Sequence, residues 1–226
     1  MNRRSSSLPP HLSVLVILAS LTITSAISAQ IERTQRDEWQ KVGEIFAAMG
    51  VSEGSRVADV GAGGGFLTVR LSEAVGEQGR VYAEDITQRS IRELNEQLES
   101  LAIGNVEPVL GDTDDPKLPL GELDAVVIVN SYHEMDQYES MLEGIWRSLQ
   151  PGGRLVIVDN PPRDTTSSRS SQTGAHDIHI TLVEQDLVAA GFEIAERRPD
   201  FIDSGSGRRS HHQWMLVAVK PVPANR

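Results

Sequence analysis

Residues 57–66 read VADVGAGGGF, and this stretch decides the fold. An apolar run ends in an acid, Asp59, glycines follow at alternating positions, and an apolar helical pattern begins directly after them. A strand, a tight glycine turn and a helix are the parts from which nucleotide-binding crevices are built. Glycine lets the main chain approach a ligand closely and adopt φ values that other residues resist. The stretch therefore predicts a ligand crevice at the end of a first strand.

The spacing of the glycines discriminates between ligands. A dinucleotide fingerprint has glycines at its first, third and sixth positions, but the sixth position counted from Gly61 is Phe66, and the register that starts at Gly63 fails in the same way. A phosphate-binding loop would end in Gly-Lys-Ser/Thr, which the sequence lacks. What remains is the pattern D-x-G-x-G-x-G, from Asp59 to Gly65.

Alternating strand and helix patterns follow the glycine turn. The run RVYAEDI predicts a second strand over residues 80–86, and the continuous apolar run LDAVVIV at 123–129 is typical of a buried parallel strand. A third strand is predicted between them, over 106–110. In the phrase LQPGGRLVIVD at 149–159, we expect a helix to end at Leu149, Pro-Gly-Gly to form a turn, and a fifth strand to follow.

Helical patterns separate these strands, and a pair of strands closes the chain. Thr181 and Glu184 form a capping-box pattern at the start of the last helix. Such alternation predicts an α/β fold with a mostly parallel sheet. The predicted helices cover 38–49, 66–75, 90–101, 135–149 and 181–190, and the closing strands cover 193–197 and 213–220.

Together these motifs resemble class I methyltransferases that use S-adenosylmethionine, from about Trp39 to Lys220. NSYHEMD at 130–136, followed by a helix and LQPGGRLVIVD, is similar to a bacterial group of small methyltransferases that often carry signal peptides, and more distantly to quinone-biosynthesis and arsenite methyltransferases. The arsenite enzymes attack through cysteines, and this chain has none. The resemblance implies a Rossmann-like, doubly wound sheet of seven strands, mostly parallel with an antiparallel last strand. It also implies S-adenosyl-L-methionine as cofactor and methyl transfer to a small-molecule acceptor.

The resemblance implies a cofactor site at the strand ends. Asp85 would bind both ribose hydroxyls, because a carboxylate accepts hydrogen bonds and donates none. Glu84 is the adjacent competitor, and the alternative is that both are solvated acids at a strand end. Asp112 resembles the acid that meets the adenine amino group, and Asn130 lies where the family lines the methyl-transfer site. The residues implied to bind the cofactor are Asp59, Gly61, Ala62, Gly63, Gly65, Asp85, Ile86, Asp112, Thr113 and Asn130.

Polar side chains after the fourth strand supply the catalytic candidates. Methyl transfer mainly requires the nucleophile and the methyl group to be aligned and water to be excluded. A base is needed where the nucleophile is a hydroxyl or a carbon acid. His133 could accept that proton, with Tyr132 or Glu134 orienting the imidazole. The alternative is that His133 and Glu134 cap the next helix or hydrogen-bond a loop.

Residues 160–177, NPPRDTTSSRSSQTGAHD, form a long polar segment without periodicity. The segment leaves the carboxyl end of the fifth strand, the ligand side of such sheets, so we expect a substrate lid, with an idle loop as the alternative. His176 and His179 have the helical spacing of metal ligands. Because the chain has no cysteine and no obvious third ligand, we expect no metal site.

Residues 1–29 have the pattern of a secretory signal peptide, which leaves 30–226 as the methyltransferase domain. Arg3 and Arg4 precede an apolar core at 12–23 that is too short to span a membrane, and small residues follow it. We therefore expect an exported, periplasmic protein with no stable membrane span after cleavage. The alternatives are an uncleaved anchor or a wrongly assigned start codon, and in the second case the protein would be cytoplasmic.

Composition narrows the possible partners. The formal net charge is −11, and loss of the leader would remove two arginines and no acids. Nucleic acid is therefore not expected as a substrate, because binding it relies on basic patches. Two alternative functions stay open: a non-catalytic module that binds an adenosine-like ligand, and a nucleotide-dependent oxidoreductase, which the glycine spacing disfavours. S-adenosylmethionine is made in the cytosol, so an exported enzyme would lie in a different compartment from the source of its cofactor.

Overall fold

The computed structural model describes residues 35–204 and 212–223. The predicted leader at 1–29 lies outside the described residues, as does most of the connection between the two closing strands. The chain divides after Lys41 into two units. In the first unit, residues 35–39 are helical. The second unit begins at Val42 and contains the sheet and every element named below.

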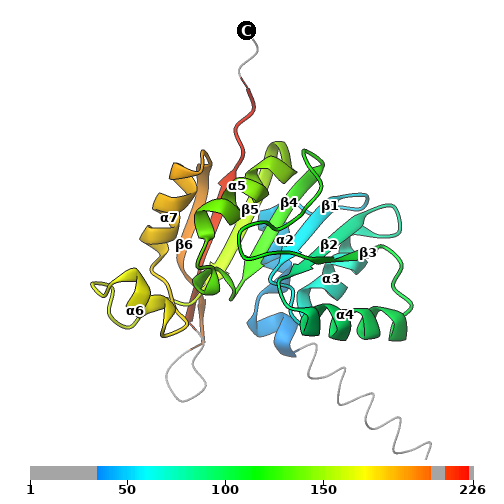
Figure 1. The fold of residues 1–226 in the computed structure, drawn as a ribbon, viewed down its shortest axis with the longest axis horizontal. Helices are drawn as coiled ribbons and strands as arrows, with labels where there is room; N and C mark the ends of the chain where they lie inside the picture. Colours follow the sequence, from blue (N-terminus) through cyan, green and yellow to red (C-terminus); the bar gives the residue numbers. More distant parts are fainter. Residues whose placement is uncertain (1–34, 205–211, 224–226) are drawn as a thin grey trace, which may run out of the picture. The chain divides into compact units, whose positions relative to one another are not determined.

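The second unit contains a seven-stranded sheet in the order β3-β2-β1-β4-β5-β7-β6 (Figure 1). Neighbouring strands from β3 to β5 are parallel, and β7 is antiparallel to both β5 and β6. This confirms the predicted mostly parallel sheet with an antiparallel last strand. The strands are β1 (Arg56–Val60), β2 (Arg80–Asp85), β3 (Val106–Leu110), β4 (Leu123–Val129), β5 (Leu149–Asp159), β6 (Glu193–Asp203) and β7 (His212–Val219).

Helices connect the strands and cover the sheet. They are α2 (Val42–Met49), α3 (Phe66–Val75), α4 (Gln88–Ser100), the 3₁₀ turn η1 (Tyr132–Glu134), α5 (Tyr138–Ser148), α6 (Arg169–Thr173) and α7 (Ile180–Ala189). In one cluster of buried residues, Val60 and Ile128 of the sheet lie with Leu142 of α5 and Val183 of α7. The helices α3 and α4 contact β1, β2 and β3. No helix in the described part of the chain is long and apolar enough to cross a membrane.

The closing elements differ from the prediction at their ends. The last helix begins at Ile180, and its N-cap is His179, whose Nδ1 accepts a hydrogen bond from the Thr181 amide at 3.3 Å. The predicted capping box of Thr181 and Glu184 is therefore wrong. Strand β6 continues past Pro199 to Asp203 because its register with β7 shifts across this stretch. Such an irregularity accommodates a residue that has no amide hydrogen to donate.

The connections around the site also differ from the prediction. Helix α5 begins at Tyr138 because residues 132–134 form the η1 turn, and β5 begins directly at Leu149. The polar segment at 160–177 contains α6, which the sequence pattern did not predict. Gln172 of α6 is buried, and its Oε1 accepts a hydrogen bond from the His179 amide at 2.8 Å. The segment is thus tied to the start of α7, and its role as a lid remains a prediction.

Candidate cofactor and acceptor site

The glycine turn joins β1 to α3 and has left-handed backbone at Gly61, Gly63 and Gly65, with φ of 74°, 53° and 78°. A Cβ at Gly61 would lie 2.4 Å from the Ser131 side-chain oxygen, so only glycine fits against the residue that precedes η1. The amides of Gly61 and Ala62 both donate to the Glu84 carbonyl at 2.9 Å. The turn is therefore fixed between β2 and the end of β4, as the predicted crevice requires.

Replacing Gly61 by alanine should lower the free energy of unfolding by about 2 kcal/mol or more. Alanine in left-handed backbone costs ~1–2 kcal/mol, and the clash with Ser131 adds to it. Gly64→Ala is the matched control, because its Cβ would meet nothing within 4 Å. Urea unfolding of the two variants measures the difference. Equal stability of the two would show that Ser131 moves aside and that the turn is less constrained than its geometry indicates.

Asp59, near the end of β1, connects this strand to α3 on the other side of the glycine turn. Its side chain is buried, and Oδ2 accepts a hydrogen bond from the Thr68 hydroxyl of α3 at 2.7 Å. Burial raises the pKa of Asp59 to about 6, although the Thr68 hydrogen bonds act in the opposite direction. The residue therefore holds the helix against the strand, and a direct contact with the cofactor remains a prediction.

Asp85 lies at the end of β2, where the resemblance places the ribose acid. Its Oδ2 accepts from the Gly63 amide at 3.0 Å, and its Oδ1 accepts from the Thr87 amide at 2.8 Å. Each carboxylate oxygen can accept two hydrogen bonds, so each has capacity left for a hydroxyl. The side chain of Ile86, next in the chain, is exposed.

Glu84 is only 1 % exposed, and its Oε1 has no hydrogen-bond partner among the described residues. Burial raises the pKa of Glu84 to about 8. The Gly61 amide acts to lower this pKa, and the charges of Asp85, Asp59 and Asp115 act to raise it. Its carboxyl group lies against the end of β3, since a Cβ at Gly111 would meet Oε1. Neighbouring strand residues point to opposite faces, and it is Asp85, not Glu84, whose carboxylate bonds the glycine turn.

The residues present fit the adenosyl cofactor that the resemblance implies. Side-chain atoms at Gly63 or Gly64 would meet nothing within 4 Å, so the main chain of the turn is open on that side. Asp85 beside the turn has free acceptor capacity, and the exposed apolar Ile86 offers a surface for a base. Bare main chain, a carboxylate and an apolar surface are the groups that a nucleoside needs at this edge of a doubly wound sheet.

The other implied cofactor residues lie on loops at the same edge of the sheet as the glycine turn. Asp112 pairs with Lys117 at 2.8 Å, and the Thr113 hydroxyl accepts from Gln137 at 3.3 Å. Asn130 has left-handed backbone with φ of 56°, and its side-chain oxygen accepts a hydrogen bond from Gln213 of β7. The three residues directly follow β3 and β4 at the carboxyl ends of these strands, and their contact with the cofactor remains a prediction.

Tyr132 lies apart from the other two catalytic candidates. Its ring is buried in the core, and its hydroxyl donates to Asp186 of α7 at 2.8 Å. Arg169 of α6 pairs with the same carboxylate at 2.5 Å. Burial, and then the Asp186 charge, raise the pKa of Tyr132 far above its ordinary value. Tyr132 therefore joins η1 to α6 and α7, and it does not orient His133.

His133 is oriented by Asp159, a residue that the sequence reading did not select. The Nδ1 of His133 lies 2.7 Å from Oδ1 of Asp159, and the His133 amide donates to Oδ2 at 3.0 Å. Burial acts to lower the pKa of His133, but the hydrogen bond and charge of Asp159 outweigh it and raise this pKa. Glu134 lies on the other side, with Oε1 3.8 Å from Nε2 of His133. The signal that could have identified Asp159 is its position as the acid that ends β5.

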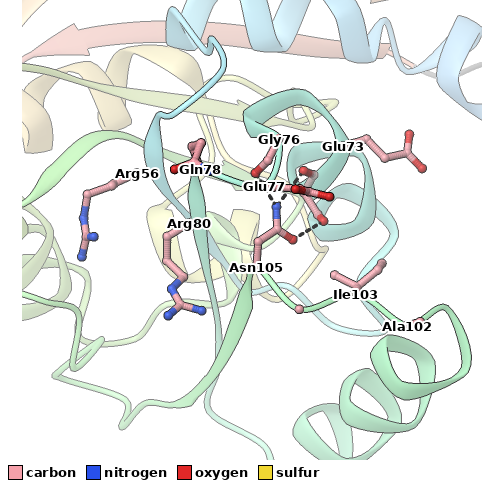
Figure 2. Close-up of a pocket in the computed structure, with 12 residues that line it drawn as sticks. Arg56, Glu73, Gly76, Glu77, Gln78, Arg80, Ala102, Ile103 and Asn105 are labelled. Atoms are coloured by element: carbon pink, nitrogen blue, oxygen red, sulfur yellow. Dashed lines mark hydrogen bonds between the residues drawn. The ribbon is translucent and has the colours of Figure 1, made fainter.

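A cavity of about 770 Å³ lies at the opposite, amino-terminal edge of the strands (Figure 2). Its lining includes Arg56 and Arg80 at the starts of β1 and β2. Asn105 at its wall donates to the carbonyls of Ser72 and Gly76 at 2.9 and 2.8 Å, which ties β3 to the end of α3. Ligands of doubly wound sheets bind at the carboxyl ends of the strands, so this cavity is separate from the predicted cofactor crevice.

Comparison with known proteins finds similarity to methyltransferases. Residues 57–153 match the family model described as "Methyltransferase domain". The ubiquinone/menaquinone biosynthesis C-methyltransferase UbiE of Yersinia enterocolitica is 32 % identical over 145 residues, which cover 64 % of this chain and 57 % of that protein. The chain thus matches little more than half the length of this curated relative.

Solved structures share the fold. A SAM-dependent methyltransferase from Aquifex aeolicus superposes with a TM-score of 0.68 and 25 % identity, covering 82 % of this chain and 92 % of that one. Phosphoethanolamine N-methyltransferase 2 of Haemonchus contortus, solved in complex with S-adenosyl-L-methionine, has a TM-score of 0.64 and 18 % identity, over 81 % of this chain and 53 % of that one. At this lower identity the likeness is one of fold alone.

Proposed function

We propose that this chain, which carries a domain of the class I S-adenosylmethionine-dependent methyltransferases, transfers a methyl group to a small-molecule acceptor. The observation that carries the proposal is the open glycine turn beside Asp85, whose two oxygens keep acceptor capacity for a ribose. The acidic net charge of −11 supports a small acceptor over nucleic acid.

The chain's own residues bind and align the reactants. When bound, S-adenosylmethionine supplies a methyl group that its sulfonium has already activated. Asp85 and the open main chain of the glycine turn hold the nucleoside, and the turn is kept in place by Ser131, whose hydroxyl lies 3.4 Å from the Gly61 carbonyl. His133, two residues further on, turns its Nε2 away from Asp159. Among residues 130–134, His133 is the one best placed to accept a proton from the methyl acceptor.

Replacing Asp85 by alanine should weaken binding of S-adenosylhomocysteine about 10- to 100-fold, because a charged acceptor of two hydroxyl groups is lost. Calorimetric titration of the parent and the variant measures the change. Asp114→Ala, an exposed acid in the loop after β3, is the control and should bind as the parent does. Unchanged affinity in the Asp85 variant would refute the ribose role of Asp85 and the register that assigns it.

The activity itself is tested with a labelled methyl group. The protein is incubated with methyl-labelled S-adenosylmethionine and an acceptor panel, and labelled products are separated. Because the relative quoted above is described as a quinone-biosynthesis C-methyltransferase, the panel includes ring acceptors of the ubiquinone and menaquinone type. Tight binding of S-adenosylhomocysteine without a labelled product from metabolite extracts would favour the non-catalytic binding module. Absence of binding would refute the proposed function.

We also propose that residues 1–29 direct export. The support is the arginine pair and the apolar core of the leader. Fusion of 1–29 to a reporter that is active only in the periplasm should give signal, and deletion of 12–23 should abolish it. A reporter that stays cytoplasmic with the intact leader would contradict export and favour a wrongly assigned start codon.

A further inference from the structure

Three side chains with metal-binding atoms converge beside the acceptor end of the sheet. His133 and Glu134 come from η1, and His176 comes from the loop that follows α6. One ligand atom from each lies within 4.8 Å of the others. Oε1 of Glu134 lies between the two imidazoles, 3.8 Å from Nε2 of His133 and 3.5 Å from Nδ1 of His176. This is the pairing of two imidazoles and one carboxylate that transition metals favour.

The free nitrogen of His133 is already directed toward this cluster. Its Nδ1 bonds the buried carboxylate of Asp159, so Nε2 faces the other way, toward Glu134. A histidine that binds a metal almost always donates its second ring N–H to a carboxylate or carbonyl, which fixes the tautomer and the ring orientation. Asp159 is fully buried and also accepts from the Asn160 amide at 2.7 Å. The orienting group is therefore rigidly held.

His176 is held in place by its backbone and by its neighbours. It has a φ of 59°, in the left-handed region that is uncommon outside glycine and in which histidine, asparagine and aspartate are the enriched exceptions. Its carbonyl accepts from the Asn160 side chain at 3.2 Å, and the Asn160 carbonyl accepts from the Ile178 amide at 2.9 Å. These bonds fix the loop to the end of β5, the same end that carries Asp159. The two imidazoles lie edge to face, with ring centres 5.5 Å apart.

A second carboxylate beside the cluster has an unpartnered atom. Oδ1 of Asp177 is buried and has no hydrogen-bond partner among the described residues. Asp177 follows His176 directly and lies near enough to His133 to interact with its charge. A buried carboxylate oxygen without a partner is unfavourable unless a cation or a water satisfies it. The surroundings of the cluster thus favour positive charge.

We propose that His133, Glu134 and His176 bind a divalent transition-metal ion of the Zn²⁺ type. Bond lengths of ~2.1 Å in a tetrahedral site place ligand atoms roughly 3.4 Å apart, close to the two separations given above. Nitrogen ligands favour Zn²⁺ and its neighbours over Mg²⁺ and Ca²⁺, which prefer oxygen. Three protein ligands leave a fourth position open, as in sites where an ion contacts a substrate.

The site is not the one that the sequence spacing suggested. His179, the second histidine of H-D-I-H, caps α7 through its Nδ1 and does not join the cluster. The other two ligands, His133 and Glu134, come from η1, which follows β4, and the loop after α6 brings His176 next to them. In a metal-loaded protein Nε2 of His133 is a ligand, so His133 is not the base, and an acceptor oxygen can occupy the open position.

The test uses the full chain without a histidine tag, after chelator treatment and dialysis, and it needs no cofactor. Calorimetric titration with ZnCl₂ should show one bound equivalent, and Co²⁺ should give the visible absorption of a tetrahedral site. His176→Asn keeps a side chain that tolerates the left-handed backbone and removes the imidazole. We expect this variant, and Glu134→Gln, to bind Zn²⁺ at least ~10-fold more weakly than the parent.

Two controls locate the site. His179→Asn removes an imidazole from the same loop and keeps a capping side chain, and His211→Asn/His212→Asn removes a histidine pair elsewhere. Both should bind Zn²⁺ as the parent does. Zn²⁺ should also raise the melting temperature of the parent and not that of His176→Asn. Absence of Zn²⁺ binding by the parent, or binding that is lost only in the His211/His212 variant, would overturn the proposal, whatever the outcome of the methyl-transfer assay.

Discussion

Replacing Asp159 by asparagine should lower the free energy of unfolding by about 3 kcal/mol or more, because hydrogen bonds to a charged group contribute ~1.5–3 kcal/mol each. The carboxylate accepts three hydrogen bonds, from the amides of His133 and Asn160 and from the His133 ring. Asparagine keeps one acceptor oxygen and turns an amide donor toward groups that themselves donate. Urea unfolding at neutral pH measures the loss.

The control for this prediction is Asp164→Asn, an exposed aspartate in the segment that follows β5, which should change stability little. Combining Asp159→Asn with His133→Ala completes a double-mutant cycle, and we expect the two changes to cost less together than separately because they remove the same contact. A stability within about 1 kcal/mol of the parent in Asp159→Asn, no more than one ordinary hydrogen bond contributes, would contradict a structural role for the Asp159 carboxylate.

Replacing Glu84 by glutamine should remove most of the fall in stability that the parent shows as pH rises from 4.5 to 8. Burial raises the pKa of Glu84 from 4.5 to about 8. Between these values the unfolded chain has released the proton and the folded chain still binds it, so the free energy of unfolding decreases with rising pH. The difference over the whole window is on the order of 4 kcal/mol.

Unfolding is measured by urea titration at intervals between pH 4 and pH 9, in parent and variant. The stability difference between the two should grow in favour of Glu84→Gln up to about pH 8 and then become constant. Asp59, whose pKa is raised from 3.8 to about 6, should leave a smaller dependence below pH 6 in the variant. The exposed Glu107→Gln on β3 is the control. Parallel pH curves for Glu84→Gln and the parent would show that Glu84 is ionised in the folded protein.

The sheet could be predicted because its signals are local. The glycine turn, the apolar runs and the acids at strand ends lie within short stretches of sequence. The choice of Asp85 over Glu84 for the glycine turn also follows from the pattern. Once β2 pairs with β1 in parallel register, strand alternation directs only one of two adjacent acids toward Gly63.

The arrangement after β4 could not be predicted, because it depends on contacts between distant parts of the chain. Tyr132 and His133 are neighbours in the sequence, but the η1 turn directs one into the core toward Asp186 and the other toward Asp159. The choice of His179 as the cap of α7, and not Thr181, depends on Gln172, which binds the His179 amide. His176 joins Glu134 only because the loop adopts left-handed backbone and is bound to Asn160.

The position of β7 has a consequence for biosynthesis. This strand lies between β5 and β6, although it follows both in the chain. Until residues 212–219 have left the ribosome, β6 has no neighbour to pair with and β5 keeps an unpaired edge, next to which the fully buried Leu216 will later pack. Exposed strand edges invite association with other chains. A nascent polypeptide of this protein therefore stays open on one side until its final strand is translated, and a chaperone that shields that edge would be most needed during this interval.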